Sequence, residues 1–271
     1  MRRLAFIFIF LHFVAALPLG AEEIRLEGNF VQGGLVFGTT LPDNAVFLDG
    51  RALRLSFDGV FVFGFGRDAG PDAILQVIKR DGTEALRKLN IAKRDYDIQR
   101  IDGLPPNMVT PPEEVLQRIR EEVTRVSTAR AFDMVGSFFK ETFIWPAEGQ
   151  ISGVYGSQRI LNGKPRRPHF GIDIAAPTGT PVVAPAGGEI RLVEPDLYFS
   201  GGTIILDHGH GVSSSFLHMS RIDVTEGERV VQGQVIGAVG ATGRVTGAHL
   251  DWRMNWFERR VDPALLIEPR N

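Results

Sequence analysis

The sequence predicts a mainly β protein in which one helix joins two β-rich parts. In the first part, short apolar runs recur at roughly ten-residue spacing between Gly and Asp turns, which is typical of a small sandwich. Residues 112–131 instead carry apolar side chains at helical spacing. From about residue 145 the chain is again rich in glycine and β-branched residues. We therefore expect a β-sandwich at 22–104, a linker with the helix at 105–140, and a second β domain at 141–271.

The composition limits the chemistry before any motif is considered. The chain has 271 residues, a formal net charge of −2, 44% hydrophobic residues and no cysteine. This length allows one or two domains with real cores, and the charge is not that of a polybasic nucleic-acid binder. The absence of cysteine excludes disulfides, thiol nucleophiles and thiolate zinc sites. Any zinc site must therefore use histidine and carboxylate ligands.

Residues 1–21 have the layout of a secretory signal peptide. Arg2 and Arg3 open the chain, an apolar run follows at 4–17, and small residues lead to Ala21 before two glutamates. The apolar run is shorter than the roughly 20 residues that a spanning helix needs. An uncleaved N-terminal anchor is the alternative. We expect cleavage after Ala21, no membrane span after signal removal, and a periplasmic or secreted protein that does not rely on disulfides.

The first β part, at 22–104, shows the expected alternation most clearly at Leu53, Leu55 and Phe57, just before an Asp-Gly turn. Apolar residues at every second position put one face of a strand into a core. This part has no histidine and no cluster of acids. An accessory, targeting or inhibitory domain and a purely structural cap both fit these observations.

The linker at 105–140 contains the single expected helix. Thr110 and Glu113 form a capping-box pattern, and prolines stand in the first turn. We interpret the helix as a connector whose apolar stripe packs against a domain and whose charged side is solvated. A partner-binding helix is the alternative. The apolar stripe consists of Val115, Leu116, Ile119, Val123 and Val126.

Histidine is scarce and unevenly distributed: five of the six histidines lie in the last 103 residues. In an extended strand His169 and Asp173 would share one face, with Gly171 leaving open space between them. By the same logic His249 and Asp251 share a face. Either pair suits a metal, and a buried His–Asp hydrogen bond is the alternative for the first.

These residues belong to a series of blocks in a fixed order, beginning with His169-Phe170-Gly171-Ile172-Asp173. The series resembles the lysostaphin-type (LytM-like) zinc endopeptidases over about 151–266. The resemblance implies an open antiparallel β domain with a zinc groove and a peptidoglycan substrate, and it does not extend to 22–104. The later blocks are 205–209, 216–220, 231–237 and 242–250.

The resemblance also implies roles for single residues. His169 and Asp173 match two zinc ligands of the family, and His218 and His249 match its catalytic histidines. The family's third ligand is normally a second histidine in a His-x-His motif. In this chain that position is Asp251, which is the one serious departure from the pattern.

Asp251 has consequences for the metal. A carboxylate oxygen binds zinc at about 2.0–2.2 Å, so coordination is physically allowed. Two carboxylates would neutralise the ion and make it a weaker Lewis acid than a set with two imidazoles would. The oxygen-rich set also suits manganese or another divalent metal. The alternative is a site that binds metal poorly, in a degenerate binding module.

Three further features receive lesser roles. The resemblance places His208 and His210 at a strand-ending turn away from the metal, and it places Tyr155 at the groove rim as a substrate contact. A serine nucleophile is the weaker rival mechanism, because serines 213–215 precede His218 without a Gly-x-Ser-x-Gly elbow.

The sequence therefore predicts an exported zinc metalloendopeptidase that cleaves peptide cross-links of peptidoglycan. The alternative is a weak or inactive cell-wall binding or amidase-activating protein on the same fold, and this alternative is motivated by Asp251. Under either hypothesis we expect no nucleic-acid partner. Peptidoglycan peptides are the expected ligands, and cell-wall hydrolases or division proteins are the expected partner proteins.

Overall fold

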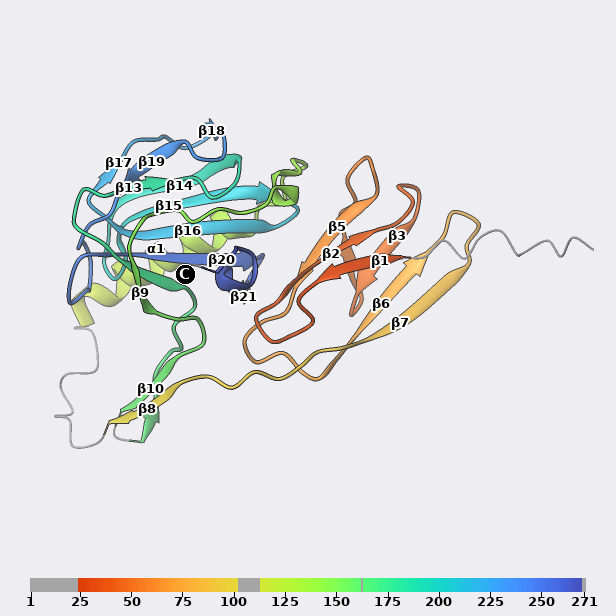
Figure 1. Ribbon diagram of the computed structural model, residues 1–271, viewed down its shortest axis with the longest axis horizontal. Helices are drawn as coiled ribbons and strands as arrows, with labels where there is room; N and C mark the ends of the chain where they lie inside the picture. The colour runs from red at the N-terminus through yellow and green to blue at the C-terminus, as the bar shows by residue number, and fades with distance from the viewer. Residues whose placement is uncertain (1–23, 102–112, 162, 270–271) are drawn as a thin grey trace, which may run out of the picture.

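The computed structural model describes residues 24–101, 113–161 and 163–269. The predicted signal peptide at 1–21 and the start of the capping box at Thr110 lie outside the described residues. Within those residues no helix is long and apolar enough to cross a membrane. The described chain is mainly β with one α-helix, as the sequence predicts (Figure 1).

The N-terminal part is the predicted small sandwich, built from two antiparallel sheets in the orders β1-β2-β5 and β4-β3-β6-β7. Leu35, Phe63 and Leu75 are among the side chains of its fully buried core. The strands are β1 (Arg25–Gly28), β2 (Leu35–Thr39), β3 (Ala45–Leu48), β4 (Arg51–Leu53), β5 (Val60–Gly64), β6 (Asp72–Ile78) and β7 (Glu84–Asn90).

One expected strand is shorter than its alternation suggests. β4 ends at Leu53, Leu55 is only partly buried, and Phe57 stands in a turn with 90% of its surface exposed. The turn continues into Gly59, which has a φ of 76°. The prediction that Phe57 shares a buried face with Leu53 is therefore wrong, because the turn begins before the apolar run ends.

The C-terminal part is built around an antiparallel sheet with the order β18-β14-β15-β16-β20-β12-β9, and β21 pairs with β20. A second sheet has the order β13-β19-β17. The strands of the main sheet are β9 (Gln150–Gly153), β12 (Ile172–Ala175), β14 (Gly188–Leu197), β15 (Gly201–Gly209), β16 (Val212–Met219), β18 (Arg229–Val230), β20 (His249–Trp256) and β21 (Arg259–Val261). Those of the second are β13 (Pro181–Val183), β17 (Arg221–Ile222) and β19 (Val235–Ala238), and short 3-10 turns lie at Glu113–Val115, Phe138–Lys140 and Pro263–Leu265.

The middle of this sheet is covered on both faces. Every residue of β15 and β16 is buried, so these strands lack the polar outer face of a half-exposed sheet. Trp252 and Trp256 of β20 are also fully buried. The strands that carry the predicted site are therefore held in a rigid core.

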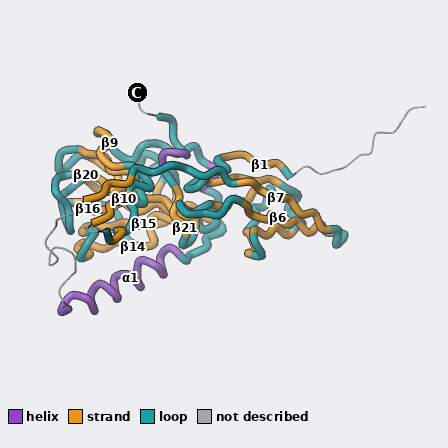
Figure 2. Tube along the Cα trace, turned by 90° about the horizontal axis from the view of Figure 1, so that it is seen from below, coloured by secondary structure: helices purple, strands orange, loops and turns teal. Residues whose placement is uncertain are grey.

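The predicted helix forms as α1 (Leu116–Arg130), which runs along one side of the sheet (Figure 2). Its charged side is not simply solvated, which corrects the prediction. Glu122 is buried, accepts a hydrogen bond from the Tyr198 backbone N–H at 2.9 Å and pairs with Arg118 at 2.6 Å. Val123 of the expected apolar stripe is 60% exposed instead. Polar contacts to the sheet domain thus help to dock this helix.

Ion pairs and hydrogen bonds tie the N-terminal sandwich to the C-terminal part, and one of the hydrogen bonds runs from Arg259 Nη1 to the Gly64 carbonyl oxygen at 3.2 Å. Arg94 pairs with the buried Asp262 at 2.8 Å, and Arg51 pairs with Glu258 at 3.1 Å. A small third sheet also crosses the predicted boundary at residue 104, because its first strand pairs in parallel with a strand of the C-terminal part. Its strands are β8 (Ile98–Ile101), β10 (Gln158–Leu161) and β11 (Lys164–Pro165).

Candidate metal centre

Neighbouring strands bring the predicted site residues together. β12 and β20 are antiparallel partners, and their register sets Asp173 opposite Asp251. β16 lies on the other side of β20 and sets Leu217, the residue before His218, opposite Asp251. His169 precedes β12 in an irregular segment rather than in the strand that the sequence analysis assumed. The site therefore depends on pairing between segments about 80 residues apart in the sequence, of the kind that sheets provide.

His169, Asp173 and Asp251 each offer a ligand atom, and these atoms lie within 4.8 Å of one another. The His169 Nε2 and Asp173 Oδ1 atoms are 3.3 Å apart, yet neither has a hydrogen-bond partner although both are buried. Buried polar atoms without a partner are rare and costly. The alternative of a satisfied His–Asp hydrogen bond is therefore not what the structure contains, and the two atoms are free to bind a metal ion.

Gly171 is needed for close packing, which corrects the prediction that it leaves open space. A Cβ atom at this position would lie 2.5 Å from the Trp252 carbonyl oxygen and 2.7 Å from Asp251 Oδ1. Both distances are well inside van der Waals contact. The missing side chain lets the segment between His169 and Asp173 approach β20.

Asp251 is held by a residue that the sequence analysis missed. Arg253 Nε donates to both carboxylate oxygens, at 2.9 and 3.0 Å, and its Nη2 donates to Oδ2 at 2.5 Å. Burial alone would raise the pKa of Asp251, but the charge and hydrogen bonds of Arg253 bring that pKa below its ordinary value. The available signal was the i, i+2 spacing, which puts both side chains on one face of a strand.

His218 and His249 form a pair beside this cluster, with ring centroids 4.9 Å apart. The Nδ1 of His218 lies 2.8 Å from the Thr242 carbonyl oxygen, and that of His249 lies 2.9 Å from the Gly247 carbonyl oxygen. A carbonyl only accepts, so each Nδ1 carries the proton and each Nε2 keeps its lone pair. Burial lowers the pKa of His218, which favours the neutral ring.

The pair is adjacent to the metal cluster without belonging to it. His249 Nε2 is 3.8 Å from Asp173 Oδ1, while the three-residue cluster leaves both rings out. The three candidate metal ligands and the two histidines thus form separate, neighbouring groups.

His208 and His210 lie outside both groups. The His208 ring is fully buried, with Nδ1 2.7 Å from the Gly187 carbonyl oxygen and Nε2 2.8 Å from Ser214 Oγ. His210 has a φ of 51° in the turn between β15 and β16. Both ring nitrogens of His208 are occupied, so these contacts give it a packing role.

Tyr155 does not lie at the rim of a groove. Its side chain is 3% exposed, its hydroxyl donates to the Arg260 carbonyl oxygen at 2.9 Å, and its ring packs edge-on against Tyr96. A buried ring whose hydroxyl is already bonded cannot meet a substrate without moving. These contacts assign Tyr155 to the packing of the two parts of the chain, in place of the predicted substrate contact.

Comparison with known proteins agrees with this geometry. The model of peptidase family M23 matches residues 167–263, which include all five predicted ligand and catalytic residues. A crystal structure of a Pseudomonas aeruginosa protein assigned to peptidase M23 aligns with a TM-score of 0.69 and 30% identity. It covers 88% of this chain and 94% of that one. The chain belongs to peptidase family M23, which confirms the resemblance found in the sequence.

Two curated relatives match shorter stretches. Cell division protein DipM of Caulobacter vibrioides is 33% identical over 134 residues, which is 47% of this chain and 21% of DipM. Peptidoglycan DD-endopeptidase ShyA of Vibrio cholerae is 40% identical over 87 residues, which is 32% of this chain and 20% of ShyA. The chain thus spans about a fifth of the length of these relatives.

Proposed function

We propose that this protein is an exported zinc metalloendopeptidase that cleaves peptide cross-links of peptidoglycan. One observation carries the proposal: His169 Nε2 and Asp173 Oδ1 are buried without hydrogen-bond partners and converge with Asp251 beside two histidines. Membership of a peptidase family and similarity to a protein named as a peptidoglycan endopeptidase support it. Periplasmic or secreted localisation is part of the proposal.

The donor set fits a catalytic zinc ion. Zinc accepts imidazole nitrogen and carboxylate oxygen, and catalytic sites keep three protein ligands and an open position. An ionised carboxylate has about four lone-pair sites, so Asp251 can accept from Arg253 and still bind metal. Two carboxylates and one guanidinium leave the set with one net negative charge, the same as two imidazoles and one carboxylate would have. Arg253 thus offsets the extra negative charge that Asp251 introduces. With Arg253 present, a bound zinc ion need not be the weaker Lewis acid that the sequence alone led us to expect.

A zinc ion bound by these residues would polarise a peptide carbonyl and lower the pKa of a water molecule. The histidine pair supplies the proton transfers. His218 and His249 each present an unprotonated Nε2, so either ring can accept a proton from the attacking water. Once protonated, a ring can stabilise the developing oxyanion or donate to the leaving amine.

The second candidate is a cell-wall binding or amidase-activating protein without hydrolytic activity. The observation that favours it is the tight pairing of Asp251 with Arg253, which satisfies the carboxylate in the absence of metal. In this account the partners are cell-wall hydrolases or division proteins. The N-terminal sandwich would serve as an accessory domain under both candidate functions.

Metal content and cleavage separate the two candidates. Purified protein is dialysed against zinc and then against metal-free buffer, and its metal is counted by elemental analysis. The same sample is incubated with cross-linked muropeptides, with and without added zinc. Close to one ion per chain and zinc-dependent cleavage support the peptidase. Substoichiometric metal together with intact cross-links would refute it and favour the binding module.

A further inference from the structure

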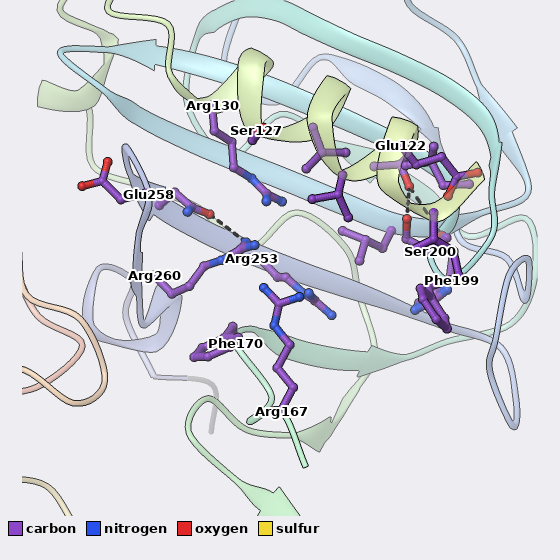
Figure 3. A pocket seen from close by; sticks show the side chains of 18 of the residues that line it. Glu122, Ser127, Arg130, Arg167, Phe170, Phe199, Ser200, Arg253, Glu258 and Arg260 are labelled. Atoms are coloured by element: carbon purple, nitrogen blue, oxygen red, sulfur yellow. Dashed lines mark hydrogen bonds between the residues drawn. The ribbon is translucent and has the colours of Figure 1, made fainter. Parts of the chain in front are cut away.

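A cavity of about 720 Å³ opens beside His218, between α1 and the strands β16, β20 and β21. Figure 3 shows side chains that line it. Leu217 and His218 form part of its wall, so it is continuous with the proposed site of cleavage. A volume of this size is typical of small-ligand sites and holds a few residues of a peptide. The contents of this cavity would lie next to the reacting bond.

Five arginines line this cavity, and four of them converge from separate parts of the chain, while Arg244 lies over the Phe199 ring. Arg130 is the last residue of α1, Arg167 precedes β12, Arg253 lies in β20 and Arg260 lies in β21. Figure 3 shows these four side chains directed toward one another across the cavity. These arginines are distant in the sequence, so the fold brings them together. The repulsion between their positive charges is unfavourable.

Only one of the four has a carboxylate partner among the described residues. Arg253 is paired with Asp251, as described above. Arg130 Nη2 donates to Ser215 Oγ at 3.1 Å, and its buried Nε has no partner. Arg260 Nη1 donates to an asparagine oxygen at 3.0 Å, and Arg167 lies over an aromatic ring. Three positive charges are therefore left without a counter-charge.

The acidic residues that line the cavity are paired elsewhere. Glu122 pairs with Arg118, and Glu258 pairs with Arg51 of the N-terminal sandwich. Burial, with the neighbouring arginines adding to it, lowers the pKa of Arg130 to about 9 and that of Arg260 well below its ordinary value. The positive charge of the cluster is thus unsatisfied, and an anion in the cavity would relieve it.

We propose that this cavity binds a carboxylate of an acidic peptide substrate, next to the bond that is cut. The proposal rests on the proposed function, because it treats the cavity as part of the substrate groove. Planar guanidinium forks match a carboxylate with two parallel hydrogen bonds, which gives both affinity and orientation. The cluster would thereby select peptides by charge and fix which bond faces His218.

The walls favour a peptide over a small free anion. The cavity wall combines the charged arginines with apolar side chains, which include Phe170, Phe199 and Val126. A free inorganic anion gains nothing from such surfaces, whereas a peptide buries its aliphatic parts on them while its carboxylate meets the arginines.

The test compares two synthetic peptides of equal length, Ala-Glu-Lys-Ala as the free acid and Ala-Gln-Lys-Ala as the C-terminal amide. Their binding to the full chain is measured by calorimetry with and without zinc. The zinc-free measurement reports binding in the absence of turnover. We expect the acidic peptide to bind at least about tenfold more tightly, a preference that falls with added salt. Arg167→Gln and Arg260→Gln should each remove most of the preference. Arg229→Gln is the matched control, because Arg229 lies on β18 at the far edge of the sheet and is 76% exposed.

The outcomes separate this proposal from the proposed function. Equal binding of the two peptides, or a preference unchanged in Arg167→Gln and Arg260→Gln, would overturn the carboxylate site even if cross-links are cut. Inorganic phosphate binding as tightly as the acidic peptide would overturn the assignment to a peptide. Arginine-dependent binding of the acidic peptide without any cleavage would leave the site standing and refute the peptidase instead.

Discussion

Arg253 clamps Asp251 through three hydrogen bonds in the wall of the candidate metal centre, and the Asp251 side chain is only 4% exposed. This pairing changes the net charge that the carboxylate brings to a position where the family usually has histidine. A carboxylate with a bound guanidinium carries no net charge, like a neutral imidazole. In this account the pair substitutes for histidine as a unit, so single and double substitutions should have different effects.

Replacing Arg253 alone should uncouple metal affinity from turnover. In Arg253→Gln the site has two uncompensated carboxylates, so zinc should bind at least as tightly while its Lewis acidity falls. We expect turnover of muropeptides to drop by about 10- to 100-fold, as is usual for residues that support a ligand. Competition with a chromogenic chelator measures the affinity. Unchanged turnover would contradict a role for Arg253.

Replacing Asp251 and Arg253 together can be compared with replacing Asp251 alone. Asp251→His alone leaves Arg253 buried beside the metal without its carboxylate, which repels the ion. The double variant Asp251→His with Arg253→Gln removes that charge and should retain zinc and activity better than the single variant does. Zinc content and muropeptide cleavage are measured side by side. A single variant that outperforms the double variant would refute the charge argument.

Removing one histidine of the pair should stop the chemistry and leave the metal in place. In His249→Ala we expect turnover to fall by about 10²- to 10⁴-fold, the usual contribution of a general acid or base. Zinc content should stay close to that of the unaltered protein, because His249 is outside the ligand cluster. His169→Ala is the contrasting variant and should lose the metal. Loss of zinc from His249→Ala would show that the roles are assigned wrongly.

Gly171 should not tolerate a side chain. In Gly171→Ala the added Cβ atom meets the Trp252 carbonyl oxygen at 2.5 Å, so β12 and β20 must separate. We expect a loss of about 1–3 kcal/mol in the free energy of unfolding, together with weaker zinc binding. Gly70→Ala is the control, since nothing lies within 4 Å of its Cβ position. Urea unfolding of both variants gives the comparison, and equal stabilities would contradict the packing argument.

His208 should make the folded state sensitive to acid. Burial lowers its pKa from 6.5 to about 4, so between these values the unfolded chain binds more protons than the folded one. The contribution of His208 is complete above pH 6.5 and is lost as the pH falls toward 4. The loss amounts to roughly 3 kcal/mol.

Urea unfolding of the unaltered protein and of His208→Asn, from pH 7 to pH 4, measures this dependence. The unaltered protein should lose stability relative to the variant as the pH falls. Burial raises the pKa of the neighbouring Asp207 to about 6, which acts in the opposite direction, but Asp207 is present in both proteins and largely cancels. Parallel curves for the two proteins would contradict the assignment.

Local periodicity predicted the fold class and the helix. The grouping of His169, Asp173 and Asp251 came from the family resemblance of the ordered blocks. The sequence could not predict the contacts that depend on strand pairing. The close approach at Gly171 emerges only when β20 is set beside its neighbours, whereas the i, i+2 spacing of Asp251 and Arg253 was a local signal that the sequence analysis missed. The family resemblance places Tyr155 at the groove rim, and the contacts that bury it, with Tyr96 and the Arg260 carbonyl oxygen, involve residues distant in the sequence.

The cluster of arginines at the cavity is also a feature that the sequence could not predict. Its four converging arginines come from the end of a helix, a loop and two strands, and no spacing in the sequence relates them. Charges of one sign at distant positions normally suggest solvated surface residues. Only the folded chain shows that they face one cavity, which His218 also lines.

The central claim is that His169, Asp173 and Asp251 together hold one catalytic metal ion. It is tested most directly by crystals grown with zinc, from which anomalous diffraction is collected at the zinc absorption edge. We predict one strong peak bonded to His169 Nε2 and to a carboxylate oxygen of each aspartate, with oxygen distances of about 2.0–2.2 Å. No peak at the cluster, or a peak bonded to His218 and His249 while Asp251 stays with Arg253 alone, would contradict the account.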